Sequence, residues 1–322
     1  MSIYVTALQN SGGSYGHKLF DVASAYLFAE WLGGELFAHE TWNVPELEPF
    51  SVCEGLRGYE ELLDVPKRSV QCNQSTWYGV DYGLAKQIHD KIRRLSEKGD
   101  ALLVLSKSCR LTLMNVWNWY HKGKIDKDVY TPVLQDLRER FYRKHKGPTG
   151  RLGVADVRVA CFARRAFMSH LTTRNGNTAE FYLNIIDGVR RALKDCRVRF
   201  TFFTQEENSE DLGCLQEVSG VNVTYDYDYS ANMCDLVYAD ILIGSYSSSS
   251  TWASYFSTGV VMVPMDDKAP PPNVRWRLNM APMIMMNHDP FPENFVAVQP
   301  DGSFDHDELC SKVAGKFGMT VV

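Results

Sequence analysis

Short runs of apolar residues alternate along the chain with longer segments whose apolar residues recur at helical spacing, and this alternation constrains the fold most strongly. The clearest runs are "IYVTAL" at 3–8, "ALLVL" at 101–105, "VRVACF" at 157–162, "VRFTFF" at 198–203 and "GVVMVP" at 259–264. Strands that are apolar along their whole length are typical of parallel sheets that helices cover on both faces. The sequence therefore predicts an α/β protein.

The segments between these runs are predicted to be mainly helical. From Leu19 onward, apolar side chains recur every three or four positions, and Gly33 and Gly34 follow where a helix C-terminal cap belongs. Further helices are predicted at 84–95, roughly 109–122, 127–144, 178–194, 230–239, from about 249, and at 306–317. Additional strands are predicted at 35–39, near Val221 and at 240–245, whereas 42–79 shows no clear periodicity.

The chain is long enough for two domains, since it has 322 residues of which 45% are hydrophobic. The most linker-like segment is "RKHKGPTGRLG" at 143–153, which is charged, carries glycine and proline, and is poor in apolar residues. Alternation of strands and helices restarts beyond it. The sequence therefore predicts two α/β domains, 1–150 and 151–322.

Composition argues against several classes of function. A net charge of −5 gives no general attraction for nucleic acid or for an anionic membrane. The eight cysteines lack metal-ligand spacing and are expected to be reduced and mostly buried. With no basic start before an apolar core, and no apolar run of roughly 18 residues, we expect a cytoplasmic protein without a membrane span.

A serine-rich turn between a predicted strand and helix is the first candidate binding site. In "DILIGSYSSSSTWAS" the residues Ser247, Ser248, Ser249 and Ser250 stand where the helix begins. The unpaired N–H groups and positive dipole end of a helix start bind anions, and serine hydroxyls add short neutral donors. The turn therefore favours a phosphate site, while simple helix capping by serine is the alternative.

Two arginines follow another predicted strand. In "VRVACFARRAF", Arg164 and Arg165 come just after the apolar run, where ligands of open α/β sheets bind. An arginine guanidinium offers a fixed fork of donors to phosphate and can offset the charge that develops on a leaving diphosphate. A solvated surface pair or a salt bridge is the alternative interpretation.

The N-terminal segment "NSGGSYGHKLF" is a glycine-rich turn that opens a helix. Gly13 and Gly16 allow close approach of the backbone to a ligand, although the spacing is not the G-x-G-x-x-G dinucleotide fingerprint. His17 is a candidate general base, because an unperturbed imidazole changes its charge near neutral pH. A hydrogen-bonding cap or surface residue is the alternative for His17, and Asp21 and Glu40 are further base candidates.

Three segments together resemble the fucosyltransferase superfamily of GT-B glycosyltransferases, including the α-1,2-fucosyltransferase and O-fucosyltransferase branches. "GGSYGHKLFDVASAYLFAEWLG" is similar to the family's "GGLGNQLFQYAFGRALA", and "DILIGSYSSSSTWAS" is similar to its "IISNSSFSWWGA". Between them, "FARR" at 162–165 resembles the family's H-x-R-R. The resemblance covers most of the chain in the right order.

Matching these motifs implies roles for individual residues. The resemblance makes Arg164 the arginine that stabilises the leaving nucleotide diphosphate, and it makes Ser248 and Ser249 the phosphate-binding pair. It places Gly16 and His17 at the cleft, with His17 in place of the family's asparagine. Two further positions differ from the family, because Phe162 replaces a histidine and Asn232 replaces the acidic residue that binds guanine. Asp228 or Asp235 is a candidate substitute for that acid.

The resemblance implies a fold of two Rossmann-like domains that face each other across a cleft. The predicted function is an inverting glycosyltransferase in which 1–150 holds a glycan acceptor and 151–322 binds the nucleotide sugar, with GDP-fucose as the implied donor. No cofactor and no metal are expected, since "DYD" at 226–228 is interpreted as a solvated acidic loop. The alternatives are another donor such as a UDP-sugar, a non-catalytic nucleotide- or sugar-binding protein, and a Rossmann oxidoreductase.

Overall fold

The computed structural model of the protein describes the chain in segments. They are residues 2–7, 15–37, 81–105, 111, 113–147, 156–163, 178–204, 212–225, 229–245, 248–264 and 293–317, with only the backbone given for 15, 17, 114, 229–231, 248 and 317. The chain divides into two compact units, Met1–Lys144 and His145–Val322. This division lies a few residues before the boundary expected at residue 150. Each unit is described by itself below.

The first unit is built on a small parallel sheet. Its strands are ordered β2-β1-β3, with β1 at Ile3–Ala7, β2 at Glu35–Leu36 and β3 at Ala101–Leu105. Every residue of β3 is buried, as expected of a parallel strand with an apolar sequence on both faces. The described helices of this unit are α1 at Tyr15–Leu32, α3 at Tyr82–Ser96, α4 at Leu113–His121 and α5 at Tyr130–Lys144.

Helix α1 ends in a Schellman cap, as the paired glycines predict. The Gly34 N–H donates to the Ala29 carbonyl at 2.9 Å, and the Gly33 N–H donates to the Glu30 carbonyl at 3.3 Å. Gly33 has a φ of 65°, in the left-handed region that glycine adopts without a steric cost. The cap turns the chain directly into β2.

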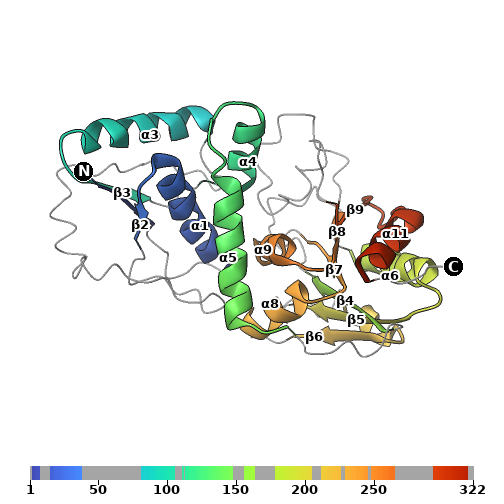
Figure 1. The fold of residues 1–322 in the computed structure, drawn as a ribbon. Helices are drawn as coiled ribbons and strands as arrows, with labels where there is room; N and C mark the ends of the chain where they lie inside the picture. The colour runs from blue at the N-terminus through green and yellow to red at the C-terminus, as the bar shows by residue number, and fades with distance from the viewer. Residues whose placement is uncertain are drawn as a thin grey trace. The chain divides into compact units, whose positions relative to one another are not determined.

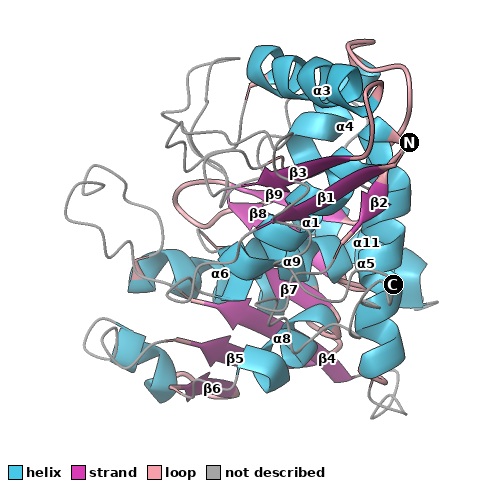
Figure 2. Ribbon diagram, turned by 90° about the vertical axis from the view of Figure 1, so that its left-hand side faces the viewer, coloured by secondary structure: helices cyan, strands magenta, loops and turns pink. Residues whose placement is uncertain are grey.

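The second unit contains a six-stranded sheet in which every paired neighbour is parallel. The strand order is β6-β5-β4-β7-β8-β9, and Figure 2 shows the strands side by side in this order. The bounds are Asp156–Phe162 for β4, Arg197–Phe203 for β5, Val221–Thr224 for β6, Ile241–Ile243 for β7, Val260–Pro264 for β8 and Phe295–Val298 for β9. Counted along this unit, the order reads 3-2-1-4-5-6, which is that of a Rossmann fold.

Helices cover both faces of this sheet. Helices α6 and α11 pack together on one face, and α8 and α9 pack together on the other (Figure 1). The bounds are Ala179–Ala192 for α6, Tyr229–Val237 for α8, Ser248–Phe256 for α9 and His306–Phe317 for α11, and a 3-10 turn η4 covers Gly213–Glu217. The two layers of helices explain why the strands are apolar on both sides.

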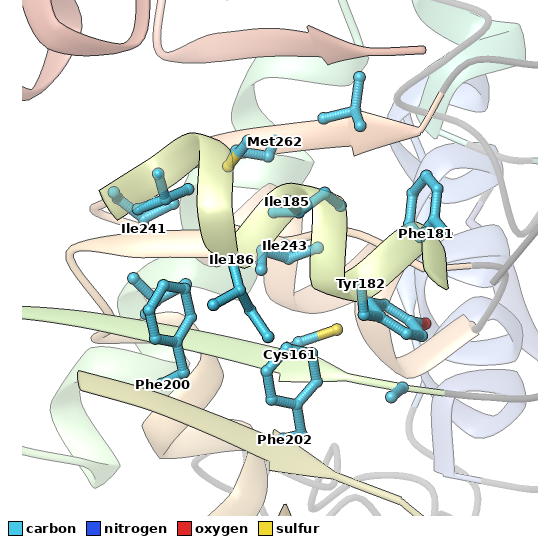
Figure 3. Packing of buried hydrophobic residues seen from close by; sticks show 14 of the residues in the cluster. Cys161, Phe181, Tyr182, Ile185, Ile186, Phe200, Phe202, Ile241, Ile243 and Met262 are labelled. Carbon is cyan, nitrogen blue, oxygen red and sulfur yellow. The ribbon is translucent and has the colours of Figure 1, made fainter. Parts of the chain in front are cut away.

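The main core of the second unit lies beneath α6. Figure 3 shows Phe181, Ile185 and Ile186 of α6 facing side chains of the sheet, which include Phe202 and Ile243. Helix α6 begins at a threonine cap, where the Thr178 hydroxyl accepts the Phe181 N–H at 3.2 Å. Its apolar side chains recur on one face, so burial and capping favour the same helix.

The structure confirms the predicted α/β class with two Rossmann-like, parallel-sheet units. The expected cleft between the domains depends on how the two units are placed relative to each other, and it stays a prediction. Strand β9 and the turn η4 were not predicted. The expectation that the cysteines are mostly buried is wrong for the described ones, because Cys161 is buried, Cys214 is exposed, and the rest are half-buried.

Among the described helices, none combines the length and the apolar character needed to cross a membrane.

Two glycine substitutions separate backbone strain from steric clash. We expect Gly33→Ala to cost about 1 kcal/mol, because a Cβ there meets no atom within 4 Å and only the positive φ is unfavourable. Gly259→Ala should cost more, because its Cβ would lie 2.2 Å from the Ala239 carbonyl oxygen. Gly213→Ala is the control, since a Cβ there meets nothing within 4 Å. Thermal unfolding midpoints that rank these variants in another order would contradict the fold.

Candidate functional site

The strand order of the second unit reverses between β4 and β7. From β4 the chain passes through α6 on one face to β5, and from β7 it passes through α9 on the other face to β8. Where neighbouring parallel strands send their connections to opposite faces, the carboxyl ends of the two strands border a crevice in which α/β proteins bind ligands. The candidate site is therefore at the carboxyl ends of β4 and β7.

Two segments predicted from the sequence begin at these neighbouring strand ends. Cys161 of β4 is aligned with Ile243 of β7 in the parallel ladder. Ala163 is the last described residue after β4, and Arg164 and Arg165 follow it directly in the sequence. The serine-rich turn follows β7 in the same way. The topology thus brings the starts of both segments together, while Arg164, Arg165 and Ser247 themselves lie outside the described residues.

A glycine allows close packing of the backbone at the end of β7. The Gly244 N–H donates to the Met262 carbonyl of β8 at 2.7 Å, and a Cβ on Gly244 would lie 3.0 Å from the same oxygen. A larger residue would require β8 to shift. The path of the chain from β7 into the serine-rich turn is therefore fixed by contact with the next strand.

The start of α9 is built from buried hydroxyl residues. The Ser245 N–H donates to the Ser250 hydroxyl at 2.9 Å, and the Ser254 hydroxyl donates to the Ser250 carbonyl at 2.8 Å. Ser250 is 1% exposed and Ser249 is 4% exposed. The Ser250 hydroxyl therefore holds the turn in place, which differs from the direct phosphate contact expected for it. For Ser248 the structure gives the first position of α9 but no side chain.

Two residues predicted to bind the nucleotide, Asn232 and Asp235, lie about one turn apart on helix α8. Asn232 is buried in the first turn, at the end of α8 that follows the carboxyl end of β6. Asp235 lies a turn later, near Arg158. Desolvation raises the pKa of the Asp235 carboxyl, and the charge of Arg158 opposes this rise.

Arg158 lies near the amino end of β4, whereas the candidate site is at the carboxyl ends of the strands. Its guanidinium donates to the Tyr238 carbonyl at 2.7 Å and lies 3.5 Å from an oxygen of Asp240, the residue just before β7. Because Arg158 is near the start of β4, the neighbouring Asp235 lies toward the amino ends of the strands. The structure therefore does not group Asp235 with the serine-rich turn. Asp228 lies outside the described residues.

In the first unit, the predicted residues follow β1 in the sequence, and helix α1 begins at Tyr15. Gly16 is buried in the first turn of α1, and His17 occupies the next position of the helix. Asp21, the further base candidate, is 3% exposed one turn later. Gly13 and Glu40 lie outside the described residues.

Metal-ligating side chains do not gather in the described segments. No group of three or more histidine, cysteine, aspartate or glutamate residues is placed there to hold a metal ion. The described part of the candidate site instead offers the hydroxyls and backbone N–H groups at the start of α9. Such neutral donors suit an anionic group of the ligand.

Sequence reasoning did not single out Ser245. Its hydroxyl is buried, and it has no hydrogen-bond partner among the described residues. The sequence signal available was its position as the first hydroxyl residue after the apolar run of β7.

Comparisons with known proteins found similarity in fold only. No family model and no curated protein matches the chain. A solved structure of an Arabidopsis thaliana FUT1 mutant in complex with GDP is 15% identical, with coverage of 81% of this chain and 70% of that chain and a TM-score of 0.45. MurG from Acinetobacter baumannii is 11% identical, with coverage of 99% of this chain and 95% of that chain and a TM-score of 0.32.

Proposed function

We propose that the protein is an inverting glycosyltransferase whose second unit binds a nucleotide sugar at the carboxyl ends of β4 and β7. The observation that carries the proposal is the pairing of these strands, because it brings the start of the arginine segment beside the start of the serine-rich turn. Taken separately, the serines could serve as a helix cap, and the arginines could be a surface pair or part of a salt bridge. Their convergence on the reversal point of the strand order favours a shared anionic ligand.

The proposed chemistry is departure of a nucleoside diphosphate from the anomeric carbon of a sugar. Negative charge grows on the leaving diphosphate as the bond breaks, and groups that already point at that charge lower the barrier. In this proposal Arg164 offsets the charge, with Arg165 beside it, and the N–H groups at the start of α9 donate to the phosphate oxygens. The residues Ser247, Ser248 and Ser249 supply hydroxyl donors.

The proposed acceptor is a glycan hydroxyl, which loses its proton as it attacks. His17 is the proposed base, and Gly13 and Gly16 are proposed to let the acceptor approach the backbone. No cofactor or metal is part of this proposal.

The proposed donor is GDP-fucose, and one observation favours a second candidate. Guanine presents two donors, N1–H and its amino group, which a carboxylate accepts together. Asn232 is a buried amide that donates as well as accepts. The first turn of α8 carries no acidic residue, and Asp235 lies toward the amino ends of the strands, so the described part of this helix places no carboxylate where guanine would need one. This favours a UDP-sugar as the second candidate.

A panel of nucleotides tests the class of ligand. We expect GDP or UDP to raise the thermal unfolding midpoint of the full chain, since a ligand at about 100 times its Kd stabilises by about 2.7 kcal/mol. ADP tests whether the protein selects the nucleobase, and CMP tests whether a diphosphate is needed. A shift produced by NAD alone would identify an oxidoreductase, and no shift with any diphosphate would contradict the proposal.

Replacing Arg164 tests whether the protein is a catalyst. We expect Arg164→Ala to lower sugar transfer by about 100- to 1,000-fold, because charge on the leaving group is no longer offset. Arg197→Ala is the matched control, since Arg197 is 73% exposed and lies 3.9 Å from Asp156 at the amino end of its strand. Transfer would be measured as release of nucleoside diphosphate with glycan acceptors. Equal rates for the two variants would contradict the role of Arg164, and nucleotide binding without transfer by the wild type would indicate a binding protein.

A further inference from the structure

Ser245 differs from the other buried serines whose hydrogen bonds the structure gives. The hydroxyls of Ser24, Ser250 and Ser257 accept backbone N–H groups, and the hydroxyl of Ser254 donates to a carbonyl. Ser245 is 7% exposed, and its hydroxyl has no partner in the described part of the chain. A buried hydroxyl without a partner is unfavourable, so its presence calls for a group that pairs with it in another state of the protein.

The backbone around Ser245 is held on both sides. The preceding residue, Gly244, donates to the Met262 carbonyl of β8, and the Ser245 N–H donates to the Ser250 hydroxyl. These bonds fix the Cα of Ser245 between the end of β7 and the first turn of α9. The hydroxyl can still turn about the Cα–Cβ bond among three staggered positions. Ser245 is thus anchored through its backbone while its side chain remains available.

The position of Ser245 indicates the chemistry of its partner. It lies two residues beyond the end of β7, at the reversal of the strand order and beside a helix start whose leading N–H groups lack intrahelical acceptors. Those N–H groups and the helix dipole favour an anion. The Ser245 hydroxyl has a proton to donate, and the neighbouring N–H groups are donors as well. The partner that suits all of them is an acceptor that carries negative charge.

We infer that the Ser245 hydroxyl donates a hydrogen bond to a phosphate oxygen of the bound nucleotide, and that Ser250 is a positioning residue that holds Ser245 in place. This inference rests on the proposed function and assigns a contact to a residue outside the serine run at 247–250. It gives the two serines different roles. Loss of Ser245 removes a ligand contact, whereas loss of Ser250 removes the acceptor of a buried N–H group.

The test compares ligand affinity with the stability of the free protein. We expect Ser245→Ala to weaken binding of GDP or UDP, and of inorganic pyrophosphate, by about 10- to 100-fold, as for loss of a hydrogen bond to a charged group. The unfolding midpoint without ligand should stay the same or rise, because an unpaired buried hydroxyl is removed. Ser250→Ala should lower that midpoint. Isothermal titration calorimetry and thermal unfolding of the full chain provide the two readouts.

Thr6→Val is the matched control. Thr6 is fully buried in β1 of the other unit, and its hydroxyl also lacks a partner among the described residues. This variant should match Ser245→Ala in stability and keep wild-type affinity for the nucleotide.

Three results would overturn the inference in different ways. Unchanged affinity in Ser245→Ala, while the wild type binds nucleotide, would remove the contact but leave the proposed function intact. Weaker binding together with a loss of stability as large as that of Ser250→Ala would make Ser245 a structural residue. Absence of nucleotide and pyrophosphate binding by the wild type would overturn the proposed function itself.

Discussion

The parallel pairing of β4 with β7 is the constraint on which the candidate site depends. Connections between parallel strands cross over a face of the sheet, and their handedness is fixed, so strands added on opposite sides of β4 send their helices to opposite faces. The chain adds β5 and β6 on one side and β7, β8 and β9 on the other. The two strand ends at the reversal point are consequently left uncovered by their own connecting helices.

The described residues at the start of α9 and in the first turn of α8 are neutral. Ser249, Ser250 and Thr251 are each at most 4% exposed, and Asn232 is 7% exposed. Burying ionised side chains there would require desolvation of charge, whereas hydroxyls, amides and helix N–H groups can lie in the interior at lower cost and still donate to an anion. In the proposed function, Arg164 and Arg165 neutralise the charge of the diphosphate, and the serine-rich turn donates hydrogen bonds that position it.

Local patterns in the sequence were enough to predict most helices and strands. The apolar run at 101–105 coincides with β3, the helix expected at 306–317 coincides with α11, and the glycine pair ends α1. Each of these features depends on neighbouring residues in the sequence. Strand β9 was missed because "FVAV" is a run of only four residues, and its place beside β8 is set by pairing between distant segments.

Details of the site needed the three-dimensional arrangement. The sequence placed arginines and serines after strands, but only the strand order shows that those two strands are neighbours. Asp235 was a reasonable carboxylate candidate until the direction of α8 placed it near Arg158. The difference between Ser245 and Ser250 depends on a single hydrogen bond, from the N–H of one to the hydroxyl of the other, which composition does not reveal.

A crystal structure of the full chain with a bound nucleoside diphosphate is the most direct test of this account. The account predicts that the diphosphate lies at the carboxyl ends of β4 and β7, with its oxygens within hydrogen-bonding distance of the first N–H groups of α9. A diphosphate bound instead at the amino ends of the strands, near Arg158, would contradict it.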